Sequence, residues 1–372
     1  MLLIKTQRDA LLAPLQSVSG IVEKRHTLPI LSNVLLEKKG DRLTLLATDI
    51  EIQITTSTGE ASGDGDGAIT VGARKLQDIL RSLPDSAEVS LALDDKRLQV
   101  RSGKSRFSLQ TLPAEDFPRM AMAEGELKKI TVTQKQFRQL LSQTQFSMAA
   151  QDVRYYLNGL LLLVDGDELR AVATDGHRLA YASMPSGNSA EGLGFRQELI
   201  LPRKTVLELN RLLADNDDAL LIELAPNQIR FQFNQISLVS KLIDGKFPDY
   251  ERVIPATPKN VVALNRTVLL QSMVRAAILT NEKFRGVRLV LTEGSLKIMA
   301  ANAEQEEAQE EIEVDYTGDA IDVGFNVGYL LDVLNNTSVE TVEWGFNDAN
   351  SSALLTIPGN ERFKYVVMPM RI

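Results

Sequence analysis

Short apolar stretches alternate with longer amphipathic stretches along the chain in a regular order. In residues 134–148, Phe137, Leu140, Leu141 and Phe146 recur near helical spacing with polar residues between them, which predicts an amphipathic helix. Strands joined by hairpin-like corners follow it, and then a further strand and a further helix. The same order predicts six helices, over the windows 7–25, 73–83, 134–148, 203–214, 265–285 and 326–335.

The chain contains three copies of one pattern. The stretches 43–49, 169–175 and 296–302 share an apolar rhythm that ends in Asp or Asn, and they start 126 and 127 residues apart. A second comparison, of the strand-to-helix segments later in each copy, gives a similar period. The repeat predicts an α+β fold of three tandem domains, each a pair of β-α-β-β-β halves with two sheets and two helices on one side. The expected domain bounds are 1–122, 123–256 and 257–372.

Composition excludes several classes of protein. Of the 372 residues none is cysteine, 44% are hydrophobic and 24% are charged, which is typical of a globular protein and not of a disordered or disulfide-stapled one. The longest purely apolar run, 160–164, is far shorter than the ~20 residues that cross a bilayer. The first residues reach polar and charged side chains too early for a secretory signal. We therefore expect a cytoplasmic protein with no membrane attachment.

Positive charge is concentrated in the predicted helices. The whole chain has a formal net charge of −8, from 41 Lys and Arg against 49 Asp and Glu. The six helix windows contain 15 Lys or Arg and only 6 Asp or Glu. A basic helical face suits a polyanion, because phosphate contacts need no reading of bases and allow sliding. The alternative interpretation is that these are ordinary solvated surface charges.

The sequence offers little support for catalysis. It contains only two histidines, His26 and His177, and no cysteine, so a structural zinc site is not expected. We find no credible Ser-His-Asp set and no nucleophile elbow. The acidic stretch 304–313 fits a solvated edge strand better than a cation site. The remaining enzymatic alternative is a metal-dependent phosphohydrolase that uses this stretch, and we otherwise expect no cofactor and no metal.

Several strings in the chain are long and specific. They include Thr27–Leu31, Val100–Leu109, Gln151–Gly159, Ala173–Leu179 and Lys241–Tyr250. Together they resemble the bacterial sliding clamp family, the beta subunits of DNA polymerase III, over essentially the whole chain. The resemblance implies a non-enzymatic processivity factor, a head-to-tail homodimer that closes as a ring around duplex DNA without sequence specificity. Twelve inward helices spaced ~9–10 Å apart would enclose a hole of roughly 25 Å, which admits a duplex.

The resemblance also implies partners and site residues. The protein partners would be DNA polymerase subunits, other replication and repair proteins, and a clamp-loader ATPase. The DNA contacts would be Arg25, Arg74, Gln151, Tyr155 and Tyr156, and the subunit interface would contain Phe107, Ile278 and Leu279. From periodicity alone, the three interface residues would be assigned to the core.

A third implied site is an apolar pocket between the second and third domains, for a partner segment with a glutamine and spaced Leu or Phe residues. Its residues would be Leu157, Thr174, Gly176, His177, Arg178, Leu179, Pro248, Arg252, Val253, Ser352, Val366, Val367, Met368, Pro369, Met370 and Arg371. Valine, leucine, methionine and proline form an apolar slot, and methionine adapts its shape to different ligands. Without the resemblance, the terminal stretch 366–370 would be interpreted as a last strand with a tail.

Overall fold

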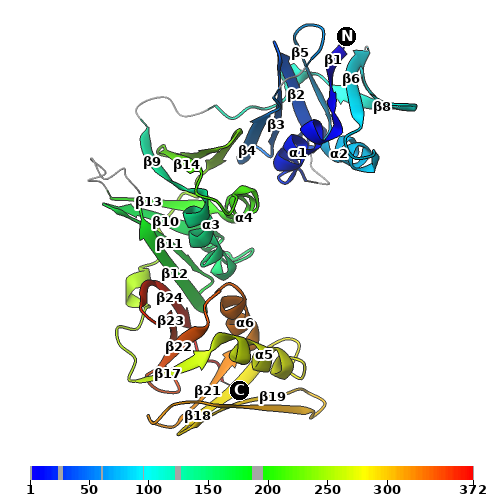
Figure 1. Ribbon diagram of the computed structural model, residues 1–372. Helices are drawn as coiled ribbons and strands as arrows, with labels where there is room; N and C mark the ends of the chain where they lie inside the picture. The colour runs from blue at the N-terminus through cyan, green and yellow to red at the C-terminus, as the bar shows by residue number, and fades with distance from the viewer. Residues whose placement is uncertain are drawn as a thin grey trace. The chain divides into compact units, whose positions relative to one another are not determined.

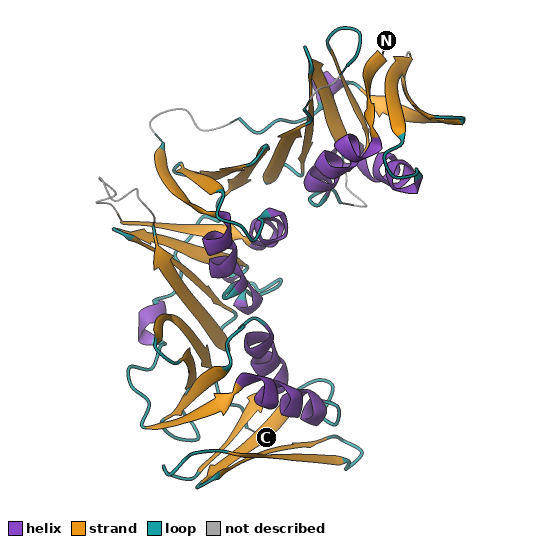
Figure 2. Cartoon of the chain, in the orientation of Figure 1, coloured by secondary structure: helices purple, strands orange, loops and turns teal. Residues whose placement is uncertain are grey.

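The computed structural model describes residues 2–23, 28–59, 62–94, 96–121, 127–186 and 196–371 (Figures 1 and 2). Their contacts form two compact units, Met1–Lys135 with Leu207–Leu242, and Gln136–Val206 with Ile243–Ile372. The described elements follow the order β-α-β-β-β six times along the chain. The predicted α+β fold, in which each of three domains pairs two such halves, is therefore confirmed.

The first unit is built on one antiparallel sheet. Its described strands are β1 (Leu2–Gln7), β2 (Asn33–Lys39), β3 (Arg42–Thr48), β4 (Ile52–Ser57), β5 (Gly67–Gly72), β6 (Glu88–Asp94), β7 (Arg97–Ser102), β8 (Ser105–Leu112), β9 (Lys128–Thr133), β14 (Ala219–Leu224), β15 (Gln228–Phe233) and β16 (Ile236–Lys241). Their order is β1-β6-β7-β8-β5-β2-β3-β4-β16-β15-β14-β9. Helices α1 (Arg8–Ser19) and α2 (Ala73–Ser82) lie side by side against it (Figure 1).

The second unit contains two antiparallel sheets. Its described strands are β10 (Gly159–Asp165), β11 (Glu168–Thr174), β12 (Arg178–Pro185), β13 (Arg196–Pro202), β17 (Asn260–Asn265), β18 (Gly286–Thr292), β19 (Ser295–Ala301), β20 (Glu307–Glu313), β21 (Ile321–Asn326), β22 (Thr341–Phe346), β23 (Ala353–Ile357) and β24 (Asn360–Val367). The sheet orders are β13-β10-β11-β12-β24-β23-β22-β17 and β20-β19-β18-β21. Helices α5 (Arg266–Ala277) and α6 (Val327–Asn335) lie side by side and pack on a core that includes Phe325, Trp344 and Tyr365.

Each block of four strands combines two halves of one domain. For example, β5 pairs with β2 and is followed by β3 and β4, while β1 pairs with β6 and is followed by β7 and β8. Blocks of successive domains join edge to edge, through β4 and β16 in the first unit and through β12 and β24 in the second. The continuous sheets explain why the compact units cut through the predicted second domain. The predicted bounds 1–122, 123–256 and 257–372 stay predictions.

The three copies turn the same polar corner after the repeated strand. The side-chain oxygen Oδ1 of Asp49, Asp175 and Asn302 accepts two backbone N–H groups, the first always from the residue two positions later. Such a side-chain bond mimics a backbone turn and favours Asp and Asn at this position. The repeat that the sequence predicts is therefore also a repeat of hydrogen bonds.

The two helices α3 (Gln134–Ser142) and α4 (Arg203–Leu212) complete the predicted six. Three helices are at least six residues shorter than their predicted windows, which are 7–25, 134–148 and 265–285. At the end of α1, the Ser19 hydroxyl donates to the Leu15 carbonyl, and Gly20 follows the helix. After α3, the Thr144 hydroxyl donates to the Leu140 carbonyl at 2.9 Å and a 3-10 turn takes over. Side-chain hydroxyls that bond backbone carbonyls compete with helical bonds, and such a bond lies at the end of each of these two helices.

The fifth predicted helix begins as expected and ends early. The Asn265 side chain caps it by accepting from the Val268 N–H at 3.1 Å. After Ala277, the N–H groups of Ile278 to Thr280 bond to carbonyls three residues back, which tightens the chain out of the α-helix. None of the described helices combines the length and the apolarity needed to span a membrane.

Candidate functional site

The corner between β11 and β12 is closed by its own side chains. The Thr174 hydroxyl donates to the Arg178 carbonyl at 2.6 Å and accepts from the Gly176 N–H at 3.1 Å. Asp175 Oδ1 accepts from the N–H groups of His177 and Arg178, at 2.9 and 3.1 Å. Gly176 has a φ of +90°, a conformation that glycine adopts without a steric penalty. The corner is therefore a fixed turn that exposes His177 to solvent.

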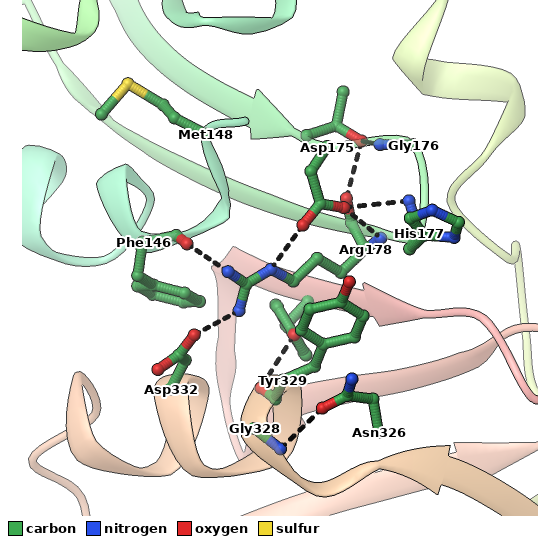
Figure 3. Close-up of polar contacts among 12 residues, drawn as sticks. Phe146, Met148, Asp175, Gly176, His177, Arg178, Asn326, Gly328, Tyr329 and Asp332 are labelled. Atoms are coloured by element: carbon green, nitrogen blue, oxygen red, sulfur yellow. Dashed lines mark hydrogen bonds and ion pairs between the residues drawn. The ribbon is translucent and has the colours of Figure 1, made fainter. Parts of the chain in front are cut away.

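A buried arginine connects this corner to α6. The Arg178 side chain is 9% exposed, and its guanidinium donates to Asp175 Oδ2 at 3.0 Å, to Asp332 Oδ2 at 2.5 Å and to the Phe146 carbonyl at 2.6 Å (Figure 3). Its Cζ atom lies 4.5 Å from the centre of the Tyr329 ring, a cation–π geometry. One guanidinium therefore holds together β12, the turn at Phe146 and α6.

The surroundings of Arg178 also fix the charge states there. Burial lowers the pKa of Arg178, but Tyr365, Asp332 and Asp175 together raise it further, so the pKa lies above its ordinary value. Burial raises the pKa of Tyr365, whose hydroxyl donates to the Tyr329 carbonyl at 2.9 Å. At neutral pH the arginine is therefore charged and the tyrosine neutral.

The residues predicted to form the pocket lie around this corner, where β12 pairs with β24. Leu179 is opposite Val366 in the register, and the Met368 N–H donates to the His177 carbonyl at 2.9 Å. Leu179 and Val366 share an apolar cluster with Tyr250 and other buried residues. The segment that ends the chain is thus bonded to the same corner that Arg178 holds.

The predicted pocket residues divide into a floor and a rim. The buried ones are Leu157, Leu179, Val366, Val367 and the side chain of Arg178, and the half-buried ones are Thr174, Ser352, Pro369 and Met370. The exposed ones are Gly176, His177, Pro248, Arg252, Val253, Met368 and Arg371. Arg252 is paired with Asp249 at 2.8 Å, and Met368 is 47% exposed. The arrangement is an apolar floor bordered by exposed apolar and basic side chains.

The residues predicted to contact DNA lie in both units. Arg74 is exposed in the first turn of α2 and donates to the Val22 carbonyl at 3.1 Å. Gln151 and Tyr155 are exposed and Tyr156 is half-buried in the segment that precedes β10, with the two tyrosine rings edge to face at 5.8 Å. Arg25 lies outside the described residues.

The segment that carries Gln151 is held by an ion pair. Arg154 donates to both carboxylate oxygens of Asp152, at 3.0 and 2.9 Å, and these bonds lower the pKa of Asp152 to about 2. The Asn158 side chain closes the same segment, since it bonds both the N–H and the carbonyl of Asp152 at 2.8 Å. Gln151 itself has a φ of +60°. These bonds fix the backbone that presents Gln151 and Tyr155.

The residues predicted for the subunit interface lie beside strand edges. Phe107 is half-buried on β8, and β8 pairs with β5 only at its last two residues, so 105–110 offer an open edge among the described strands. Ile278 is 75% exposed and Leu279 half-buried just after α5. In the four-stranded sheet β20 is an edge strand. An open edge with apolar neighbours is a ready site for pairing with another chain.

The two open edges carry opposite charge. At β8, Lys104 and Arg106 are exposed, whereas at β20 Glu307, Glu311 and Glu313 are exposed. Within the acidic stretch 304–313, residues Glu307–Glu313 form this edge strand, as the sequence indicates. No group of three His, Asp or Glu residues in the described parts of the chain has the arrangement of a metal site.

Sequence reasoning missed three residues that hold Arg178. Phe146 acts through its backbone carbonyl, which leaves no signal in the sequence, and Tyr329 acts through its ring. Asp332 is the one acidic residue of α6, so an isolated carboxylate in an otherwise apolar helix was a usable signal. Nothing local pairs it with Arg178, because 154 residues separate them.

Comparison with known families gives a consistent result along the whole chain. Residues 2–121 match the DNA polymerase III beta subunit, N-terminal domain, residues 131–249 match its central domain, and residues 251–371 match its C-terminal domain. The three matches follow the chain in the order that the internal repeat predicts.

Individual relatives agree with the family matches. The chain is 50% identical over 366 residues to a beta sliding clamp of Pseudomonas putida, and 47% identical over 366 residues to that of Escherichia coli; each alignment covers 98% of this chain and 99% of the relative. A crystal structure of a DNA polymerase sliding clamp from Pseudomonas aeruginosa superposes with a TM-score of 0.93 at 47% identity and covers 100% of both chains. A Caulobacter crescentus beta sliding clamp superposes with a TM-score of 0.92 at 41% identity and covers 100% of this chain and 99% of that chain.

Proposed function

Because the chain belongs to the family of DNA polymerase III beta subunits, the bacterial beta sliding clamps, we propose that its helices face duplex DNA inside a ring closed by a second copy. The chain is a non-catalytic processivity factor, so the phosphohydrolase alternative based on 304–313 is rejected. The observation that carries the proposal is the sixfold β-α-β-β-β order. Each of the six segments contains one α-helix at the same position, so every domain contributes two such helices. The ring acts with DNA in the bacterial cytoplasm.

Charge on the helices supports the DNA-facing assignment. The helices α2, α3, α4 and α5 each carry two or three Lys or Arg, although the chain as a whole is acidic. Exposed members such as Arg74, Lys75, Lys135 and Arg138 suit phosphate contacts, which bind any sequence and permit sliding. Arg25, Gln151, Tyr155 and Tyr156 join them in the proposal. Weak contacts of this kind leave retention on DNA to the closed ring.

Strand edges support the closure of the ring. The basic edge at β8 in one copy suits the acidic edge at β20 in the next, and Phe107 would meet Ile278 and Leu279 beside that seam. Such a contact joins two different surfaces, so it closes only if the rotation between copies completes a ring. A head-to-tail homodimer satisfies this condition with two equal seams. A clamp-loader ATPase would open one of them.

The corner held by Arg178 supports the assignment of the partner pocket. Its buried floor at Leu179 and Val366 and its exposed rim at Val253 and Met368 offer an apolar seat to a short segment. Arg178 holds the corner in place, so the apolar surface is already formed before the partner segment binds. This reduces the entropy cost of binding. DNA polymerase subunits and the clamp loader would bind here, as would other replication and repair proteins.

Primer extension on a primed single-stranded circle tests the proposal. With polymerase III core and clamp loader present, addition of this chain should lengthen products from tens to thousands of nucleotides. A variant that lacks residues 368–372 should remain a folded dimer yet behave as if no clamp were added. Products of equal length with and without the full chain would refute the function, and full activity of the truncated variant would refute the pocket.

A further inference from the structure

The corner at 174–178 has a counterpart in the first unit, between β3 and β4. The Thr48 hydroxyl donates to the Ile52 carbonyl at 2.9 Å and accepts from the Ile50 N–H at 3.0 Å. Asp49 Oδ1 accepts from the N–H groups of Glu51 and Ile52, at 3.0 and 2.9 Å. Every one of these bonds has its equivalent in the corner that Arg178 holds. The two corners are therefore the same structure in successive copies of the repeat.

The strand that joins each corner is also equivalent. The Lys241 N–H donates to the Glu51 carbonyl at 2.9 Å, just as the Met368 N–H donates to the His177 carbonyl at 2.9 Å. In the register, β4 meets β16 as β12 meets β24, with Gln53 opposite Val239 and Leu179 opposite Val366. Lys241 thus occupies the position of Met368, a predicted pocket residue. The first unit therefore contains the same frame, that is, the corner and the paired strand that border the proposed partner pocket.

A Phe-Pro segment covers both frames. Phe117 is buried against Leu35 and Leu46, and Pro118 follows it. In the second unit, Phe247 is buried in the cluster under the pocket, and Pro248 follows it as a rim residue. The covering segments therefore enter both frames in the same way.

A cavity of about 260 Å³ opens at the first frame. Ile50, Pro118, Met120 and Ala121 supply its apolar lining, and its two charged lining residues are the cations Arg119 and Lys241. The carboxylates that pair with these cations, Glu37 and Glu51, are not part of the lining. The volume is below the roughly 300–1,000 Å³ of sites for cofactors and drug-sized ligands, and it suits one apolar side chain with its neighbour.

The lining residue Ile50 is strained without an evident benefit to folding. Its φ is +71°, a region that β-branched side chains rarely adopt, and its side chain remains 41% exposed. The equivalent position in the second unit is Gly176, which adopts its φ of +90° freely. A strained residue that stays exposed at a cavity points to a functional constraint.

We propose that this cavity is a second docking site for a partner segment, one with an apolar anchor next to an acidic residue. The anchor occupies the space beside Ile50 and Met120, and the carboxylate meets Arg119 and Lys241. This site has Lys241 where the pocket of the second unit has Met368, and Gln53 where that pocket has Leu179. These two differences give the site a different preference for the sequence of the partner segment. The inference rests on the proposed function, because it assigns to the cavity of the first unit the kind of partner segment that is proposed for the pocket of the second unit.

Methyl NMR on the intact dimer tests both sites in one spectrum. The methyl groups of methionine and isoleucine are labelled. Met120 and Ile50 report binding at the new site, and Met368 and Met370 report binding at the pocket of the second unit. The probe is the peptide Ser-Gln-Leu-Asp-Leu-Phe-Ser, and the control probe replaces its aspartate by lysine. We expect the aspartate peptide to shift all four signals to saturation, and the lysine peptide to shift only Met368 and Met370.

Two matched variants separate docking from a general change in the fold. Ile50→Gly removes the exposed side chain and the strain, so it should weaken binding at Met120 at least about tenfold, a difference of 1.4 kcal/mol. Ser86→Gly, at another positive φ in the same unit, should leave binding at Met120 unchanged. Both variants should leave the signals of Met368 as in the parent, and neither should lower the thermal midpoint, because each places glycine at a positive φ.

The outcomes distinguish this inference from the proposed function. Shifts at Met368 without any at Met120 or Ile50 overturn the second site and leave the pocket of the second unit intact. Equal shifts at Met120 with both peptides, or an Ile50→Gly variant that binds as the parent does, also overturn it. Shifts at none of the four signals overturn the proposed pocket as well as this inference.

Discussion

The guanidinium of Arg178 donates to the carboxylate of Asp332 at 2.5 Å and so joins the corner before β12 to α6. The two partners are unequal, because the Arg178 side chain is 9% exposed and that of Asp332 is 46% exposed. Asp332 can be solvated when its partner is removed, whereas a buried guanidinium or its buried acceptors cannot. The same bond therefore has different consequences when it is broken from either end.

Substitutions at the two ends test this asymmetry. Arg178→Met leaves Asp175 Oδ2 and the Phe146 carbonyl without the guanidinium that donates to them, and we expect it to cost about 3 kcal/mol of stability. Asp332→Ala leaves the Arg178 guanidinium its bonds to Asp175 Oδ2 and to the Phe146 carbonyl, so it should cost less than Arg178→Met. Hydrogen exchange should accordingly rise within 174–178 in the first variant and stay unchanged there in the second. Equal exchange in the two variants would contradict the asymmetry.

Charges at the proposed seam should prevent dimerisation. Ile278→Asp combined with Leu279→Asp would bury two unpaired carboxylates in an apolar contact, at a cost of about 4 kcal/mol or more, which corresponds to at least about a thousandfold in the dimer Kd. Sedimentation velocity should show a folded monomer. Val153→Asp, at a side chain that is 95% exposed and outside the seam, is the control and should remain dimeric. A dimer that survives the double substitution would place the seam elsewhere.

Loss of one phosphate contact should weaken DNA binding uniformly across sequences. Arg74→Ala should lower affinity for duplexes of any sequence and reduce the slope of log affinity against log salt by about one. The measurement is a fluorescence titration over a range of salt concentrations with two unrelated duplexes. Arg42→Ala, which removes an exposed arginine from β3, is the matched control and should leave the slope unchanged. An unchanged slope for Arg74→Ala would exclude that residue from the DNA contacts.

The ion pair beneath Gln151 gives a prediction for pH. The bonds from Arg154 lower the pKa of Asp152 from its ordinary 3.8 to about 2. Because the pKa in the folded state is below that of the unfolded chain, the stabilisation is complete above about pH 4 and is lost as the pH falls through about 2. A carbon NMR titration should show the low midpoint in the parent and a higher midpoint in Arg154→Ala, still below the ordinary 3.8 because the backbone N–H of residue 154 continues to donate to Asp152. The same midpoint in both proteins would mean that Arg154 does not hold this carboxylate.

The repeat could be predicted from sequence because its marks are local. The stretches that end in Asp49, Asp175 and Asn302 each pair an apolar strand with a polar corner, and both features follow from neighbouring residues. Helix ends were less predictable. The hydroxyl of Thr144 ends α3 inside a stretch whose apolar spacing would continue the helix, so periodicity alone gives too long a helix.

The contacts of the sites depend on residues far apart in the chain. Arg178 stands in a recognisable string, but its partners Phe146 and Asp332 come from other elements, and one of them acts only through its backbone. The corner between β3 and β4 in the first unit could likewise be predicted only in part. Its corner at Thr48 follows from the repeat, whereas the cavity needs Lys241, a neighbour that only the pairing of β4 with β16 provides.

Topological retention on DNA tests the central claim most directly. The labelled protein is loaded onto a nicked circular plasmid by a clamp loader, isolated by gel filtration in high salt, and the plasmid is then cut once. We expect the protein to stay with the circle and to leave within minutes of linearisation, because a closed ring slides off free ends and weak phosphate contacts do not hold it. Retention on the linear DNA equal to that on the circle, or loss from the intact circle in high salt, would contradict the account.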